Sequence, residues 1–235
     1  MRIQLSHIDY FINNTRILDD ITCTFTTGIS YIIGKNGLGK STLLKLITTA
    51  IQPTAGKITF TRLIHDDDGV YRKQLTNEEI RKMIGYMPQH FIGHPDMTIE
   101  RYLTYIAFHK GIPHKLVKPT IDKWLQKTNL VELSRRKLRH LSGGQRQKVG
   151  LIQALINQPR ICILDEPFEG LDTQERLLFK RVIERLSLYS IIIMSTHLLE
   201  EIDLSANDWL FYLKGEKISI YKSTNEILAE FKKDK

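Results

Sequence analysis

The feature that most constrains this chain is a glycine-rich segment, Gly34 to Ser41, that reads Gly-Lys-Asn-Gly-Leu-Gly-Lys-Ser. It matches the phosphate-binding pattern G-x-x-x-x-G-K-[ST]. The apolar run 29–33 before it predicts a buried strand. Leu43, Leu44 and Ile47 after it predict one face of a helix. This order of strand, loop and helix indicates an anion site, because glycines let consecutive backbone N–H groups point at one phosphate.

The end of this loop supplies two side chains with separate roles. Lys40 offers a positive charge to the β- and γ-phosphates, and Ser41 offers a hydroxyl to Mg²⁺. The positive end of the helix dipole also attracts the phosphate groups. We therefore expect a nucleoside triphosphate with Mg²⁺ on Gly34, Lys35, Asn36, Gly37, Leu38, Gly39, Lys40, Ser41 and Thr42.

A second candidate site follows the apolar run 161–164, where two acids stand together. A buried strand there would present Asp165 and Glu166 at its carboxyl end, where open α/β sheets bind ligands. Asp165 is placed to hold Mg²⁺, and Glu166 to orient or deprotonate an attacking water. The alternative is a strand that merely ends in acidic residues.

The remaining pattern predicts one α/β domain over residues 1–235. Residues 1–34 show strand signals, and after residue 145 helices alternate with buried strands, which favours a mostly parallel sheet. Apolar side chains recur at helical spacing from Ile99 to Ala107, so we expect a helical segment of about 90–145 inserted in the core. Residues 209–221 read as a hairpin.

Two segments contain residues that could bind a metal ion, but in each segment another explanation fits better. Residues 62–78 are polar, and Asp66-Asp67-Asp68-Gly69 at their centre predicts a solvated turn. His90 and His94 are four apart, but Gly93 lies between them and no acid accompanies them. We expect surface or interface histidines.

Composition limits the class of partner. Lys and Arg number 34 against 26 Asp and Glu, a formal net charge of +8. The basic residues are scattered, so we expect a solvated surface and no direct nucleic-acid partner. No apolar run approaches the roughly 18 residues of a membrane span, so we expect no crossing of a membrane. Cys23 and Cys162 lie in apolar runs and are expected to be small buried hydrophobes.

The decisive motif is Leu141-Ser142-Gly143-Gly144-Gln145, a hydroxyl and two glycines at the start of a predicted helix. With the phosphate loop and the Asp165-Glu166 strand in this order and spacing, the chain resembles the nucleotide-binding subunit of an ATP-binding-cassette (ABC) transporter. The resemblance implies the fold of such a cassette: a mostly parallel core sheet, an N-terminal antiparallel β part and an inserted helical subdomain. It covers essentially the whole chain.

The resemblance also implies further site residues. Gln89 stands where the family's glutamine loop contacts Mg²⁺ and the attacking water. His197 stands where a histidine contacts the γ-phosphate, and Asp172 lies in the loop that crosses to a second subunit. Tyr10 or Phe11 would stack on adenine. Ser142, Gly143, Gly144 and Gln145 would contact the ATP of a second copy.

The implied function is an ATP-hydrolysing subunit at the cytoplasmic face of the plasma membrane. Its partners would be a transmembrane permease subunit and either a second copy or a paralogous ATPase. Residues 97–103 and Glu175-Arg176 look similar to bacterial ATPases that export drugs or peptides, so export of such an amphipathic cargo is the prediction.

Two other classes remain as alternatives. A soluble ABC ATPase acting on ribosomes or DNA usually carries two cassettes or a long heptad insertion, and neither is found in this sequence. A small-molecule kinase would share the phosphate loop but has no need of residues 141–145.

Overall fold

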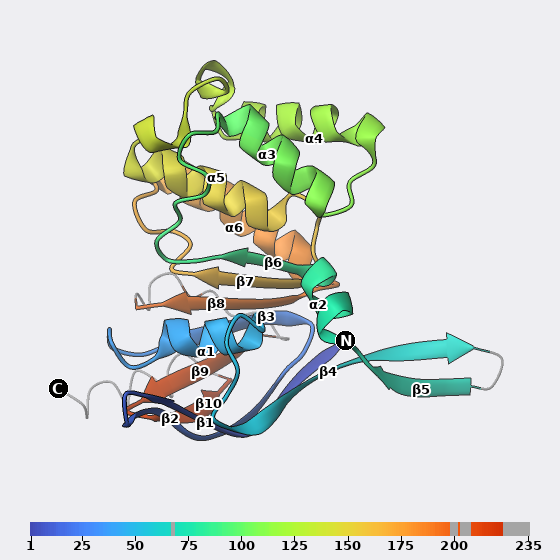
Figure 1. The fold of residues 1–235 in the computed structure, drawn as a ribbon, viewed down its shortest axis with the longest axis vertical. Helices are drawn as coiled ribbons and strands as arrows, with labels where there is room; N and C mark the ends of the chain where they lie inside the picture. The colour runs from blue at the N-terminus through green and yellow to red at the C-terminus, as the bar shows by residue number, and fades with distance from the viewer. Residues whose placement is uncertain (67–68, 198–201, 203–207, 223–235) are drawn as a thin grey trace.

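Two β-sheets organise the chain in the computed structural model, which describes residues 1–66, 69–197, 202 and 208–222 (Figure 1). The core sheet has the strand order β10-β9-β3-β8-β7-β6. Its neighbours run parallel except for β10, which is antiparallel to β9, so the predicted mostly parallel core sheet is confirmed. The strands are β3 (Gly28–Ile33), β6 (Ile84–Met87), β7 (Ile161–Asp165), β8 (Ile191–Thr196), β9 (Trp209–Lys214) and β10 (Lys217–Tyr221).

The core sheet is covered on both faces, as the continuous apolar strands predict. On β7, Cys162 and Leu164 pack in the core cluster that includes residues of α5 (Gly143–Leu155) and α6 (Thr173–Ser187). Ile161 and Ile163 point to the opposite face and join the cluster that contains α1 (Lys40–Ile47). Burial raises the pKa of the Cys162 thiol to about 12, which agrees with its expected role as a buried hydrophobe.

The second sheet is antiparallel, with the order β2-β1-β4-β5, and confirms the predicted N-terminal β part. Ile3, Leu5 and Phe25 from this sheet share the core cluster of α1. The helix therefore lies between the two sheets, and its first residue, Lys40, stands beside both. The strands are β1 (Arg2–Ile12), β2 (Thr15–Phe25), β4 (Ala55–Asp66) and β5 (Gly69–Gln74).

Helices fill the expected segment between residues 90 and 145. They are α3 (Ile99–His109) and α4 (His114–Lys127), followed by the short 3₁₀ turns η1 (Val131–Leu133) and η2 (Leu138–His140). Figure 1 shows α3 and α4 beyond α5, on its side away from the core sheet. Among the helices of the described ranges, none combines the length and apolar character that a membrane span requires.

The sequence predicted only a turn at the centre of the polar segment 62–78, whereas most of this segment is regular structure. There β4 and β5 form a long hairpin that projects from the body of the molecule, followed by α2 (Asn77–Met83) (Figure 1). All six residues of β5 are exposed, so no alternation of apolar and polar residues marks it as a strand. Asp67 and Asp68, at the predicted centre of the turn, lie outside the described residues.

Candidate functional site

The predicted nucleotide residues meet at one edge of the core sheet. The phosphate loop follows β3, Gln89 follows β6, Asp165 and Glu166 come at the end of β7, and His197 follows β8. These four strands are parallel, so their carboxyl ends share an edge, with β8 between β3 and β7. Two segments that are more than 120 residues apart in sequence thus face one another across a single strand.

The phosphate loop is held in shape by its own lysine. Lys40 is buried, and its Nζ donates hydrogen bonds to the carbonyl oxygens of Gly34 at 2.8 Å and Lys35 at 3.1 Å. Gly39, just before α1, has a φ of 92°, and a Cβ there would lie 2.8 Å from Cγ2 of Ile17. Only glycine fits this conformation and this space without strain, so the loop is prearranged around the helix N-terminus.

Burial lowers the pKa of the Lys40 ammonium group, and the Glu166 and Asp165 carboxylates act in the opposite direction. The net shift is downward. A triphosphate bound beside Lys40 would favour the charged ammonium form.

The two acids are fixed by contacts to β8 and to the segment after it. Asp165 is 2% exposed, and its Oδ1 accepts a hydrogen bond from Ser195 Oγ at 2.5 Å. Glu166 has a φ of 49°, in the left-handed region, and its backbone N–H donates to the same Ser195 Oγ at 2.9 Å. His197 Nδ1 lies 3.0 Å from Glu166 Oε2. Backbone strain at Glu166 is thus balanced by contacts that aim its carboxylate.

Sequence reasoning missed two residues that hold these acids. Ser195 is fully buried and bonds to both carboxylate residues. Gln147, on α5, donates from Nε2 to the carbonyl oxygens of Glu166 at 3.0 Å and Pro167 at 3.1 Å. The position of Ser195, two residues before His197, was a usable signal, whereas nothing near Gln147 in the sequence marks its contact.

The predicted signature begins α5 and is satisfied by its own helix. Ser142 is exposed and caps the helix: its Oγ accepts from Gln145 N at 3.3 Å, and Gln145 Oε1 accepts from Ser142 N at 3.0 Å. A Cβ added to Gly143 would meet nothing within 4 Å, whereas one added to Gly144 would lie 2.7 Å from the carbonyl oxygen of Gly170. The outer glycine is open to solvent, and the inner one lets the loop before α6 approach.

That loop is tied to α5 by a second contact. Asp172 caps α6, since its Oδ1 accepts from Glu175 N at 2.8 Å. Glu175 in turn pairs with Lys148 of α5, with 2.6 Å between Oε1 and Nζ, and Lys148 also donates to the Thr128 carbonyl oxygen at 2.9 Å. These contacts link α5 to α6 and to the loop before α6.

The two candidate aromatic residues differ in exposure. Tyr10 packs against the core cluster of α1, whereas Phe11 is 37% exposed, and the Arg16 guanidinium carbon lies 5.2 Å from its ring centroid. The next residue, Ile17, borders Gly39 of the phosphate loop. Of the two, Phe11 has the more exposed ring.

The predicted metal ligands suit Mg²⁺ by their chemistry. Ser41, Gln89 and Asp165 offer oxygen donors, which this hard cation prefers. The part of the chain that the structure describes holds no group of three or more His, Cys, Asp and Glu residues that could cage a metal. A Mg²⁺ ion that shares its coordination with phosphate oxygens needs only one or two protein ligands, so the residues fit this role.

The comparisons with known proteins agree with this geometry. A family model described as "ABC transporter" matches residues 18–169. The chain is 28% identical over 203 residues to the uncharacterized ABC transporter ATP-binding protein YhaQ of Bacillus subtilis. The aligned residues cover 86% of this chain and 64% of YhaQ. It spans 58% of the length of YxlF, a second Bacillus subtilis ABC transporter ATP-binding protein.

A third relative is covered more fully. The zinc import ATP-binding protein ZnuC of Buchnera aphidicola is 32% identical over 200 residues, 83% of this chain and 74% of that protein. Among solved structures, the dimeric structure of MJ0796, a bacterial ABC transporter cassette, superposes with a TM-score of 0.78 at 22% identity, covering 94% of this chain and 98% of that one. At this identity the match shows the fold. Since the family model covers well over half of the chain, the chain belongs to the ABC transporter family.

Proposed function

We propose that this chain binds and hydrolyses ATP between two cassettes and thereby drives a separate transmembrane permease subunit. The observation that carries this proposal is the contrast at the nucleotide residues: Lys40 and Asp165 are buried at the sheet edge, whereas Ser142 and Gly143 are exposed at the start of α5. An exposed hydroxyl beside an open glycine is available to the γ-phosphate of ATP on a second copy, or on a paralogous ATPase. Each molecule would then present the same surfaces to the other, an isologous arrangement.

The residues of the edge divide the reaction between them. Lys40 holds the β- and γ-phosphates, and Phe11 stacks on adenine. Water attacks the γ-phosphorus, its proton passes to the Glu166 carboxylate, and the bond between the γ-phosphorus and the bridging oxygen breaks to leave ADP and phosphate. When bound by Ser41, Asp165 and Gln89, Mg²⁺ supplies charge that offsets the phosphate oxygens.

His197 orients the general base in this scheme. Its Nδ1 contact to Glu166 Oε2, at 3.0 Å, holds the carboxylate in one position, and a ring that carries protons on both nitrogens would also donate from Nε2 to the γ-phosphate. The backbone of Glu166 is fixed independently by Ser195. The base therefore needs little rearrangement when ATP binds.

The permease would contact the segment that follows Gln89. Residues about 90–145 form the proposed helical subdomain, and its first residues line a surface hollow next to the signature: Ile92 is 59% exposed there, close to Gly143 and Gly144. Movement of the signature on dimer formation would reach the permease by this short path. Such a contact would hold the chain peripherally at the cytoplasmic face of the membrane.

Export of a drug, peptide or similar amphipathic cargo is our proposal for the direction of transport, on the sequence of residues 97–103. A relative named as a zinc import protein is 32% identical in sequence, so the direction of transport calls for a direct test. The test uses inverted vesicles that hold the chain with its permease, with ATP added outside. Cargo would accumulate inside these vesicles if the transporter exports it, and would not accumulate if the transporter imports it.

The experiment that tests the core of the proposal is ATP-dependent dimerisation. The Glu166→Gln variant keeps the hydrogen-bonding shape of the side chain and removes the base. Sedimentation velocity should show a monomer without nucleotide and a dimer with ATP and Mg²⁺. A monomer under both conditions, with ATP bound, would overturn the shared site.

A further inference from the structure

A groove on the far side of the cassette from the nucleotide residues combines basic and apolar side chains. Its lining comes from α4, from the segment between α5 and β7, and from the end of α6. Leu155 and Gln158 precede the first residue of β7, and Tyr189 precedes the first residue of β8. The groove therefore lies at the amino ends of these strands, whereas the nucleotide residues lie at their carboxyl ends.

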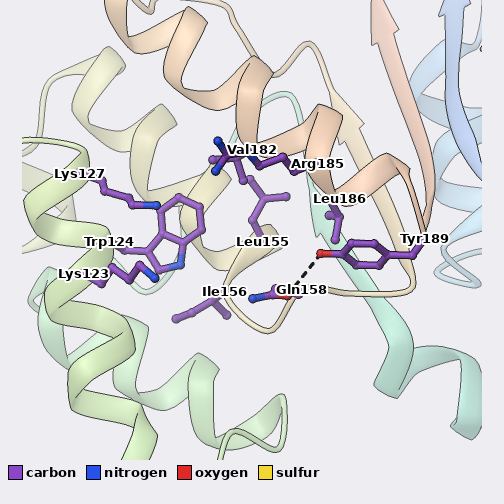
Figure 2. A pocket seen from close by; sticks show the side chains of 10 residues that line it. All are labelled: Lys123, Trp124, Lys127, Leu155, Ile156, Gln158, Val182, Arg185, Leu186 and Tyr189. Atoms are coloured by element: carbon purple, nitrogen blue, oxygen red, sulfur yellow. Dashed lines mark hydrogen bonds between the residues drawn. The ribbon is translucent and has the colours of Figure 1, made fainter. Parts of the chain in front are cut away.

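The charged side chains of the groove are all basic. Lys123, Lys127 and Arg185 line it, and no acidic residue does. Figure 2 shows the amino groups of Lys123 and Lys127 beside the indole ring of Trp124, with the Arg185 side chain extending toward the same ring. Within the described ranges, none of these three cations has an ion pair or hydrogen bond to a carboxylate. Three neighbouring cations without such a partner favour an anionic ligand.

The floor of the groove is apolar and firm. Leu155, Val182 and Leu186 lie beneath the cations (Figure 2). Trp124 is stacked on the buried ring of Phe179, with centroids 6.2 Å apart and planes 16° apart. At one end, Tyr189 Oη donates to Gln158 Oε1 at 3.4 Å. A rigid aromatic wall binds an apolar group with little ordering cost.

The size and course of the groove distinguish between possible ligands. This part encloses about 210 Å³, below the roughly 300–1,000 Å³ of pockets that enclose a small molecule. A second hollow continues from it past Gln158 and Tyr189 to Pro113, and adds Lys110 and Arg160. An elongated surface with a small apolar notch fits one anchoring side chain on an extended peptide better than a compact molecule.

We propose that this groove binds an acidic peptide segment of a partner protein, with a leucine or aromatic side chain seated against Trp124 and acidic neighbours paired with Lys127 and Arg185. The inference goes beyond the proposed transport function and does not depend on nucleotide binding. Because the walls belong to α4 and α6, a bound segment would fix the helical segment against the core.

Fluorescence of Trp124 gives a direct test. The chain has two tryptophans, so Trp209→Phe leaves Trp124 as the only indole. The probe is a synthetic peptide of alternating Glu and Leu with one central Phe. Two matched peptides replace every Glu by Gln, or every Leu and Phe by Ser. We expect the first peptide to shift the Trp124 emission in a saturable manner, and both matched peptides to bind at least tenfold more weakly.

Charge reversal in the groove sharpens the test. In the same background, Lys127→Glu with Arg185→Glu should weaken peptide binding at least tenfold. The control pair Lys57→Glu with Lys115→Glu makes the same net charge change at exposed sites outside the groove, and should leave affinity within twofold. Thermal unfolding of each variant verifies folding. The proposal is overturned if no peptide shifts the emission, if the Gln or Ser peptide binds equally well, or if both pairs of substitutions have the same effect.

Discussion

The edge of the core sheet and the start of α5 hold the two halves of the nucleotide machinery in contrasting ways. At the sheet edge, Lys40 and Asp165 are almost inaccessible, and each is bonded to groups inside the fold. At the start of α5, Ser142 is exposed and forms hydrogen bonds with Gln145 in the first turn of its own helix. Both regions are rigid, but only the first is enclosed.

Under the proposed function, each copy of the chain would contribute one enclosed half and one exposed half to the two composite sites. The enclosed half is shaped by the fold and is ready for phosphate before any partner arrives. The exposed half is stable alone because the capping box satisfies its backbone N–H groups, so it does not collapse onto the molecule. A partner with ATP can then meet a preformed surface.

The largest expected effect lies in the enclosed half. Glu166→Gln should lower ATP turnover by about 10²–10⁴-fold, because a general base contributes that much, while ATP affinity stays close to that of the parent. Phosphate release and equilibrium binding of a fluorescent ATP analogue measure the two quantities. Turnover at the parent rate would remove Glu166 from the role of base.

A negative charge at position 142 should disrupt the exposed half of the site. Aspartate is as good a helix cap as serine, so Ser142→Asp should leave the melting temperature nearly unchanged. Its negative charge would face the γ-phosphate of the partner's ATP, and like charges in an interface cost several kcal/mol, so ATP-dependent dimerisation should weaken roughly 10²-fold. Sedimentation in the Glu166→Gln background measures this, with Ser142→Thr as the control that keeps both cap and hydroxyl. Unweakened dimerisation by the aspartate variant would contradict the split site.

Loss of the loop lysine should have a smaller effect, and on binding itself. Lys40→Ala removes a charged hydrogen-bond donor that contributes about 1.5–3 kcal/mol to a buried contact, so ATP affinity should fall about 10–150-fold. Equilibrium dialysis of the monomer measures it. Lys35→Ala is the matched control, since its side chain is exposed and only its carbonyl oxygen contacts Lys40. Equal losses in the two variants would indicate a general charge effect.

The contact between the signature and the loop before α6 predicts the smallest change. Gly144→Ala places a methyl group 2.7 Å from the Gly170 carbonyl oxygen, which should lower the free energy of unfolding by about 1–3 kcal/mol. Gly143→Ala is the control, because its Cβ meets open space. Urea denaturation of both variants gives the difference. Equal stabilities would show that the loop moves aside without cost.

The features that the sequence predicted best are those with a strong local pattern. The phosphate loop, the acidic strand end and the continuous apolar strands each carry a local signal, and the parallel core sheet is confirmed. The β4–β5 hairpin was missed because its outer strand is exposed throughout and shows no period of two. The helix α2, which follows β5, buries only Ile80. Thr76 and Glu79 form a capping box, a sequence pattern that could have predicted the start of this helix.

Support contacts of the site were the least predictable part. Ser195 and Gln147 act through bonds to residues 19 to 30 positions away, and such pairings depend on which strands and helices become neighbours. The left-handed backbone of Glu166 is also invisible in the sequence, because a glutamate there breaks the local preference for negative φ. Local patterns identify what can react, and the fold decides how it is held.

The close backbone approach of Gly144 and Gly170, with the Lys148–Glu175 ion pair behind it, has a consequence for the thermodynamics of assembly. Two independently mobile loops would each lose conformational entropy when a second cassette docks. Here both lost that freedom when the monomer folded. Amide protons in the first turns of α5 and α6 should therefore exchange with solvent deuterium in a single cooperative opening, at one shared rate, before any nucleotide is added.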